Sequence, residues 1–184
     1  PGTVDSFHTD NGYETTGIPE LQNNEKLYAS ESSWSKTDLI ALMNQGGSFI
    51  HHVGHANSGY AMKFSNSDIT NTNFTELNGV DHNYTIIYSH GCICGAFDNS
   101  DCIGETMTKI DNLAAAVYMN SRYGWFNEGQ TEGPAAHINR ELVDAFYDKL
   151  ETRLGSALTS ARISTAPWVN APGQWEEGAL RWNY

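Results

Sequence analysis

Three short apolar runs stand out from an otherwise polar chain. Residues 48–53 read Ser-Phe-Ile-His-His-Val, residues 84–89 read Tyr-Thr-Ile-Ile-Tyr-Ser, and residues 114–119 read Ala-Ala-Ala-Val-Tyr-Met. Strands that are buried on both faces of a parallel sheet have such nearly continuous runs of β-branched and aromatic residues. The pattern therefore predicts three parallel strands.

The segments between these strands carry helical signals. Ser35 is a predicted N-cap, Asp38 stands three residues later as in a capping box, and Gly46 and Gly47 provide a stop. Residues 1–24 have no hydrophobic period and are predicted to be a loop-rich N-terminal segment. Alternating strands and helices indicate an α/β fold with a parallel sheet in a three-layer sandwich. The predicted helices span 33–44, 103–108, 135–150 and 153–163.

The net charge of the chain limits the classes of partner that it is expected to bind. The 184 residues carry a formal net charge of −12 with only ten basic residues. This balance argues against nucleic acid and anionic membranes as partners, and it suits a protein or peptide substrate with cationic groups. No apolar run has the length of a membrane span, so membrane insertion is not expected. The chain opens on Pro1 without a signal peptide or an initiator Met, and we expect the rest of a larger polypeptide around it.

Two reactive residues follow the first two predicted strands. His55 comes just after residues 48–53, and Cys92 comes just after residues 84–89. The carboxyl ends of neighbouring parallel strands meet at one edge of the sheet, where ligands bind in such folds. A nearby imidazole makes a thiol nucleophilic near neutral pH. The arrangement predicts a cysteine-dependent acyl transferase, most simply a peptidase.

Four motifs stand in order along the chain: Gly54-His55-Ala56, Gly91-Cys92-Ile93-Cys94-Gly95-Ala96-Phe97, Asn120-Ser121-Arg122-Tyr123-Gly124-Trp125, and the helix with His137, Arg140, Glu141 and Asp144. Together they resemble the gingipain family of cysteine peptidases, which belongs to the caspase-hemoglobinase group. The resemblance covers residues 26–163, and this chain departs from it at Ala56, where the family more often has Gly. It implies a caspase-hemoglobinase-like fold in a secreted bacterial protein. It also implies that residues 1–184 form a single, incomplete catalytic domain, because the family's domain begins earlier and adds a later strand.

The same resemblance assigns roles to the residues at the strand ends. Cys92 matches the nucleophile, and His55 matches the general base and acid of a Cys-His dyad. The backbone N–H groups of Ala56 and Cys92 would then face the oxyanion that develops during acyl transfer. A buried, inert thiol is the alternative interpretation of Cys92.

Three other histidines lie near these strand ends. His51 and His52 fall inside the first predicted strand and point to opposite faces, so we expect structural roles for them. His90 adjoins Cys92 and is too close along the chain for its ring to swing in line with the sulfur. A metal site at His51 and His55 would need helical spacing, and this segment is predicted to be a strand.

The three cysteines form an odd set. If Cys92 stays unpaired as a nucleophile, Cys94 and Cys102 either form a disulfide or remain reduced, and the sequence leaves both alternatives open. The spacing lacks the second ligand pair of structural zinc sites. We expect no cofactor; residues 98–101 are a candidate for structural calcium, although they lack the EF-hand pattern.

Substrate selection is expected from the loop after the third strand. Tyr123 and Trp125 would line a pocket for a long side chain, and Glu128 and Glu132 would bind its cationic end, which predicts cleavage after Arg or Lys. The alternative is an ordinary aromatic loop with solvated acids. Three N-terminal acids are further candidates to bind a basic substrate or His55: Asp5, Asp10 and Glu14.

Two functions from different classes follow. The first is a secreted cysteine endopeptidase that hydrolyses peptide bonds through Cys92 and His55. The second is a catalytically inactive gingipain-like module used for surface adhesion or interaction. A dinucleotide- or phosphate-binding module is disfavoured, because no Gly-rich phosphate loop follows a strand.

Overall fold

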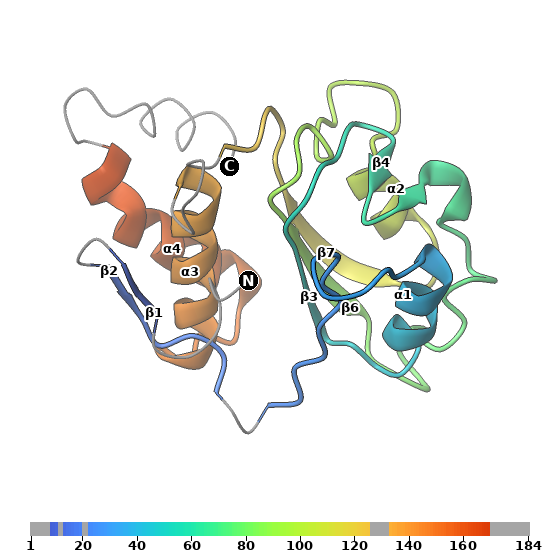
Figure 1. Ribbon diagram of the computed structural model, residues 1–184, viewed down its shortest axis with the longest axis horizontal. Helices are drawn as coiled ribbons and strands as arrows, with labels where there is room; N and C mark the ends of the chain where they lie inside the picture. The colour runs from blue at the N-terminus through green and yellow to red at the C-terminus, as the bar shows by residue number, and fades with distance from the viewer. Residues whose placement is uncertain (1–7, 11–12, 20–21, 126–132, 170–184) are drawn as a thin grey trace. The chain divides into compact units, whose positions relative to one another are not determined.

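The computed structural model describes residues 8–10, 13–19, 22–125 and 133–169 (Figure 1). The chain divides into two compact units. Residues 27–124 form the body of the first, and the segments 1–26 and 125–182 form the body of the second. None of the helices in the described part of the chain is long and apolar enough to cross a membrane.

The first unit is built on a parallel sheet of three strands, β3 (Phe49–His52), β6 (Thr85–Ser89) and β7 (Ala114–Met119). Their order is β3-β6-β7, and both pairings are parallel, which confirms the three predicted strands (Figure 1). The register pairs His52 with Ser89, and Ser89 with Met119. The three strands therefore end at the same level, at one carboxyl edge.

Two helices of this unit, α1 (Lys36–Met43) and α2 (Ile103–Lys109), pack on one face of the sheet (Figure 1). The predicted capping box is present at the start of α1: the Ser35 side chain accepts a hydrogen bond from the Asp38 N–H, and the Asp38 carboxylate accepts one from the Ser35 N–H. The core between sheet and helices is apolar and fully or almost fully buried. It includes Leu39, Met43, Ile87, Ile103, Met107 and Leu113.

The connection from β3 to β6 contains a small hairpin that the sequence pattern does not predict. Its strands, β4 (Tyr60–Ala61) and β5 (Phe64–Ser65), pair antiparallel, and the short 3₁₀ helix η1 (Asn66–Asp68) follows. Met62 and Lys63 form its turn with φ of 55° and 64°. Positive φ at both central residues is the requirement of a type I′ turn, usually met by Asn and Gly. Two-residue strands are too short to produce a hydrophobic alternation.

The second unit contains a hairpin of β1 (His8–Asp10) and β2 (Tyr13–Thr15). The sequence predicted a loop-rich segment in residues 1–24 without strands, so it missed these two strands. Each strand has three residues, and such a short segment gives no recognisable period.

Two helices complete the second unit, α3 (Pro134–Tyr147) and α4 (Leu154–Val169), and they pack against each other. They confirm the two predicted helices, although α4 runs six residues beyond its predicted end at 163. The segment that follows the β1–β2 hairpin is connected to α3 by a hydrogen bond from the Gly17 N–H to Asp144 Oδ1, at 2.9 Å. One stretch of α3 buries several polar side chains: His137, Asn139, Arg140 and Asp144.

Candidate active site

The loops that leave β3 and β6 touch each other at the carboxyl edge of the sheet. The His90 N–H donates to the His52 carbonyl oxygen at 2.9 Å and extends the β3–β6 ladder beyond the last strand residue. One residue later, a methyl group on Gly91 would lie only 2.4 Å from the Ala56 Cβ. Gly91 precedes Cys92 and Ala56 follows His55, so the chain neighbours of the two predicted catalytic residues are in direct contact.

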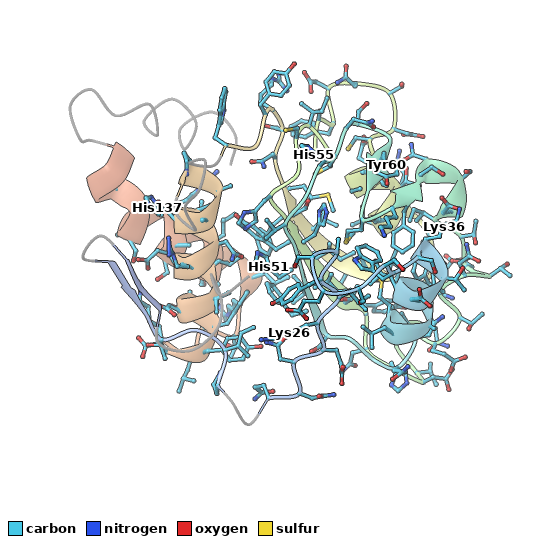
Figure 2. All side chains as sticks on the ribbon, in the orientation of Figure 1. Lys26, Lys36, His51, His55, Tyr60 and His137 are labelled. Carbon is cyan, nitrogen blue, oxygen red and sulfur yellow. The ribbon has the colours of Figure 1, made fainter. Side chains whose placement is uncertain are left out.

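His55 lies beyond the end of β3, whereas His51 lies within the strand (Figure 2). The His55 side chain is exposed. Among the described residues it forms no hydrogen bond that would fix its ring. Its ring is therefore available to a ligand at this edge of the sheet.

The Cys92 thiol is unpaired and half-buried, as predicted. Its Sγ lies 3.8 Å from the Gly124 carbonyl oxygen, at the limit of an S–H hydrogen bond. The next residue, Ile93, has a φ of 46°. Left-handed backbone at a β-branched residue is strained and persists only where the surroundings impose it. The strain is therefore located directly beside the candidate nucleophile.

The backbone N–H groups around Cys92 are used unequally. The Gly91 N–H donates to Ser89 Oγ at 3.0 Å, and the Ile93 N–H donates to the Arg122 carbonyl oxygen at 2.7 Å. Between them, the Cys92 N–H has no acceptor among the described residues, and the same is true of the Ala56 N–H. No group in the described part of the chain thus binds the two N–H donors that were predicted for an oxyanion hole.

Asn120 holds the turn that carries Cys92, and sequence reasoning missed this role. The side chain is completely buried just after β7, and its Nδ2 donates to the carbonyl oxygens of His90 (2.9 Å) and Gly91 (3.1 Å). Its main-chain oxygen accepts a hydrogen bond from the Gly95 N–H at 3.0 Å. The available signal was a polar residue directly after a predicted strand, at the edge where the reactive residues lie.

Two glycines permit the close packing of this turn. A methyl group on Gly95 would lie 2.8 Å from the Met119 carbonyl oxygen and 2.9 Å from its Cβ. A methyl group on Gly124 would lie 2.0 Å from the His90 carbonyl oxygen. Both contacts are closer than a Cβ tolerates, and both carbonyl oxygens belong to the backbone. Gly95 and Gly124 are therefore required for steric reasons, because any side chain at either position would collide with the backbone.

His52 is part of the support for the turn. Its Nδ1 lies 2.8 Å from Ser89 Oγ, which also accepts the Gly91 N–H. The direction of the His52–Ser89 hydrogen bond depends on the tautomer of the ring, because the Ser89 hydroxyl can donate one hydrogen bond and accept two. Burial lowers the pKa of His52 to about 4. These contacts fit the structural role predicted for His52.

His51 and His90 form a pair of their own. Their Nε2 atoms are 2.9 Å apart, and the ring of Tyr88 packs edge-on against His90 at a centroid distance of 5.3 Å. Burial lowers the pKa of His51 to about 3. The His90 ring is thus engaged with His51 and Tyr88, which agrees with the prediction that His90 is not the base for Cys92.

The other two cysteines are free and buried, so the disulfide alternative is not formed. Cys94 Sγ lies 3.4 Å from the Gly91 carbonyl oxygen and 3.6 Å from Ser89 Oγ. Burial raises the pKa of Cys94 to about 11, and burial also raises the pKa of Cys102. Both thiols are consequently poor nucleophiles near neutral pH.

The residues predicted to bind substrate are only partly described. Tyr123 and Trp125 have 62% and 47% of their surface exposed, so both aromatic side chains are accessible. Glu128 and Glu132 lie outside the described residues. The pocket predicted for a cationic side chain therefore stays a prediction.

Residues 98–101, the candidate calcium site, contain two carboxylates that are paired with basic side chains. Arg122 donates two hydrogen bonds to Asp98, at 3.1 and 2.9 Å, and these lower the pKa of that carboxyl. Asp101 is paired with Lys109. In the part of the chain that the structure describes, no three His, Cys, Asp or Glu side chains come together to hold a metal.

The fold is an α/β fold. At one edge of its parallel sheet, the loop that contains His55 packs against the turn that contains Cys92. The profile of Peptidase family C25 matches residues 3–184, and the chain belongs to that family. Among curated proteins, no sequence matches.

Two solved structures share this fold. One is described as the "Arg specific cysteine proteinase gingipain R (RGPB)", with a TM-score of 0.61 and 14% identity over 79% of this chain. The other is the complex of Porphyromonas gingivalis RgpB pro- and mature domains, with a TM-score of 0.57 and 13% identity over 79% of this chain. The matched region spans 33% and 34% of those two chains. The predicted resemblance and the α/β fold class are thereby confirmed.

Proposed function

We propose that this protein is a cysteine endopeptidase in which Cys92 is the nucleophile and His55 is the general base and acid. The observation that carries the proposal is the contact between Gly91 and Ala56, at which a methyl group on Gly91 would lie 2.4 Å from the Ala56 Cβ. It brings the residue before Cys92 against the residue after His55. The half-buried, unpaired thiol and the exposed imidazole support the same assignment, since both residues follow strands that end at one edge of the sheet.

Acylation begins with the attack of the Cys92 thiolate on the carbonyl carbon of the scissile bond. A C–S bond forms, and the carbonyl electrons move to oxygen. When the tetrahedral intermediate collapses, the C–N bond breaks and the His55 imidazolium gives its proton to the leaving amine. The product of this half-reaction is a thioester on Cys92 with a neutral His55.

Deacylation uses the same two groups. His55 takes a proton from water as the water oxygen attacks the thioester carbonyl carbon. The C–S bond then breaks, the acid product leaves, and the thiolate–imidazolium pair is restored. The N–H groups of Ala56 and Cys92, which have no acceptor among the described residues, would stabilise the oxyanion in both halves. Removing one such donor typically costs about 10²–10³ in kcat.

We further propose cleavage after Arg or Lys in a secreted protein. The exposed rings of Tyr123 and Trp125 would stack on a guanidinium, and Glu128 and Glu132 would supply the negative charge. The fold likeness to a structure described as Arg-specific supports the same choice. Secretion is proposed from the family resemblance, and detection of the protein in the culture medium would test it.

The central test compares Cys92→Ala, His55→Gln and His82→Gln in the full polypeptide, with a mixed library of fluorogenic peptides. His82 is the matched control, because its ring packs beside Gly46, away from the carboxyl edge. Cys92→Ala should abolish hydrolysis, and His55→Gln should lower kcat by about 10²–10⁴-fold. His82→Gln should retain wild-type kcat.

Two outcomes would contradict the proposal. If Cys92→Ala still hydrolyses the peptides, the nucleophile lies elsewhere. If the folded wild-type polypeptide hydrolyses none of them, the inactive interaction module is the better description. Unfolding curves of each variant exclude loss of structure as the cause.

A further inference from the structure

We infer that Asn120 is a positioning residue that fixes the orientation of the Cys92 turn. The inference rests on the proposed role of Cys92 as nucleophile. Asn120 follows β7, the strand beside the one that delivers Cys92, and it reaches the turn through three hydrogen bonds.

The bonds to Asn120 bracket the candidate nucleophile. Its Nδ2 binds the carbonyl oxygens of His90 at 2.9 Å and Gly91 at 3.1 Å, directly before Cys92. Its main-chain oxygen accepts the Gly95 N–H at 3.0 Å, three residues after Cys92. Two consecutive carbonyls that point toward one amide fix the rotation of the peptide planes between them. The direction of the Cys92 N–H and of its thiol depends on these planes.

The orientation of the Asn120 side-chain amide is determined by its surroundings. The side chain is completely buried, and Oδ1 has no hydrogen-bond partner among the described residues. Only the NH₂ group can face two carbonyl oxygens, so the orientation of the amide is unique. A buried acceptor without a partner is unfavourable for stability. What this amide holds is the main chain directly before Cys92, through its two donated hydrogen bonds.

The same residue begins the loop that carries the candidate substrate residues. The Arg122 carbonyl oxygen accepts the Ile93 N–H at 2.7 Å, and the Gly124 oxygen lies 3.8 Å from Cys92 Sγ. A methyl group on Gly124 would lie 2.7 Å from Asn120 Nδ2. The loop after β7 thus packs against the Cys92 turn, and the Asn120 amide lies where the two meet. A shift of this amide would displace the nucleophile and Tyr123 together.

The experiment compares Asn120→Ala with Asn112→Ala in the full polypeptide. Asn112 is a matched control at the other end of the same strand, because its Nδ2 also donates to two main-chain carbonyls, those of Asn71 (3.3 Å) and Phe74 (2.9 Å). Three quantities are measured for each variant: the thermal midpoint of unfolding, kcat and KM for a cleaved peptide, and the rate at which iodoacetamide labels Cys92, read by peptide mass spectrometry.

Asn120→Ala should lower kcat by about 10²-fold, the size of effect that a displacement near 1 Å has on catalysis, and it should also slow the labelling of Cys92. Asn112→Ala should lower the midpoint of unfolding at least as much while keeping kcat and the labelling rate at wild-type values. Equal kcat and labelling rates in the two variants would overturn the inference. If the wild type cleaves no peptide, the proposed function fails, and the labelling rates still test the position of Cys92.

A second variant, Asn120→Asp, gives a readout that a merely structural role would not move. The new carboxyl would face two carbonyl oxygens in a buried site, which raises its pKa. When protonated, it can donate one of the two hydrogen bonds; when ionised, it can donate neither. The kcat of Asn120→Asp relative to wild type should therefore rise as the pH is lowered from 8 to 5.5. A ratio that does not change with pH would contradict the role of the donated hydrogen bonds.

Discussion

Gly91 and Ala56 are packed so closely that a methyl group on Gly91 would overlap the Ala56 side chain, at a Cβ–Cβ distance of 2.4 Å. The same methyl would lie 3.1 Å from Ser89 Oγ and 3.4 Å from the Gly54 carbonyl oxygen. The two residues are far apart along the chain and belong to loops that follow neighbouring parallel strands. Their contact sets the separation between the loop of His55 and the turn of Cys92.

This contact predicts a specific compensation between two substitutions. Gly91→Ala should lower the free energy of unfolding by about 1–3 kcal/mol through overpacking and should strongly reduce peptide hydrolysis. Ala56→Gly removes the methyl that is struck, so the double variant Gly91→Ala with Ala56→Gly should recover much of both losses. Chemical denaturation and kcat measurements complete the cycle. Strictly additive effects of the two substitutions would show that the loops do not touch as described.

The three thiols should react very differently with an alkylating reagent. Burial raises the pKa of Cys94 to about 11 and also raises the pKa of Cys102, so neither has an appreciable thiolate fraction at pH 7.5. Iodoacetamide should therefore label Cys92 alone in the native protein, and all three cysteines after unfolding in urea. Peptide mass spectrometry gives the site. Labelling of Cys94 at the same rate as Cys92 in the native protein would contradict the described burial.

The stability of the protein should fall in mildly acidic solution. Burial lowers the pKa of His52 from 6.5 to about 4, so between these pH values the unfolded chain binds a proton that the folded chain does not. The free energy of unfolding then decreases as the pH falls, by at most about 1.4 kcal/mol per pH unit for one such group. His51, whose pKa burial lowers to about 3, contributes in the same direction.

Urea denaturation between pH 7.5 and 4.5 measures this dependence. His52→Asn keeps a polar amide that can hydrogen-bond with the Ser89 hydroxyl in either direction and does not titrate. Its free energy of unfolding should therefore depend less steeply on pH than that of the wild type. Identical slopes in the two proteins would mean that His52 is not buried in its neutral form.

Glycine at position 95 should be irreplaceable, unlike glycine at position 47. A methyl group on Gly95 would meet backbone and Cβ atoms of Met119 within 2.9 Å, whereas nothing lies within 4 Å of a methyl on Gly47. Gly95→Ala should lower the free energy of unfolding by about 1–3 kcal/mol and should reduce the labelling of Cys92. Gly47→Ala is the control and should change neither quantity appreciably. A Gly95→Ala variant as stable as Gly47→Ala would contradict the packing of the turn.

The sequence by itself determined the parallel sheet and the edge at which its reactive residues lie. The runs at 48–53, 84–89 and 114–119 predicted β3, β6 and β7, because nearly continuous apolar and aromatic runs are typical of strands in a parallel sheet. The capping box at Ser35 was predictable for a similar reason, since it depends only on residues three positions apart. The positions of His55 and Cys92 beyond their strands follow from the same pattern.

Only the tertiary structure decided how the residues beyond the strands contact each other. The bonds from Asn120 to His90 and Gly91, and the pairing of His51 with His90, join residues that are about thirty or more positions apart. A single sequence contains no local signal for such contacts, because they depend on strand order and register rather than on periodicity. The free state of Cys94 and Cys102 was decided in the same way. Their number and spacing allowed a disulfide, and in the structure both thiols are free.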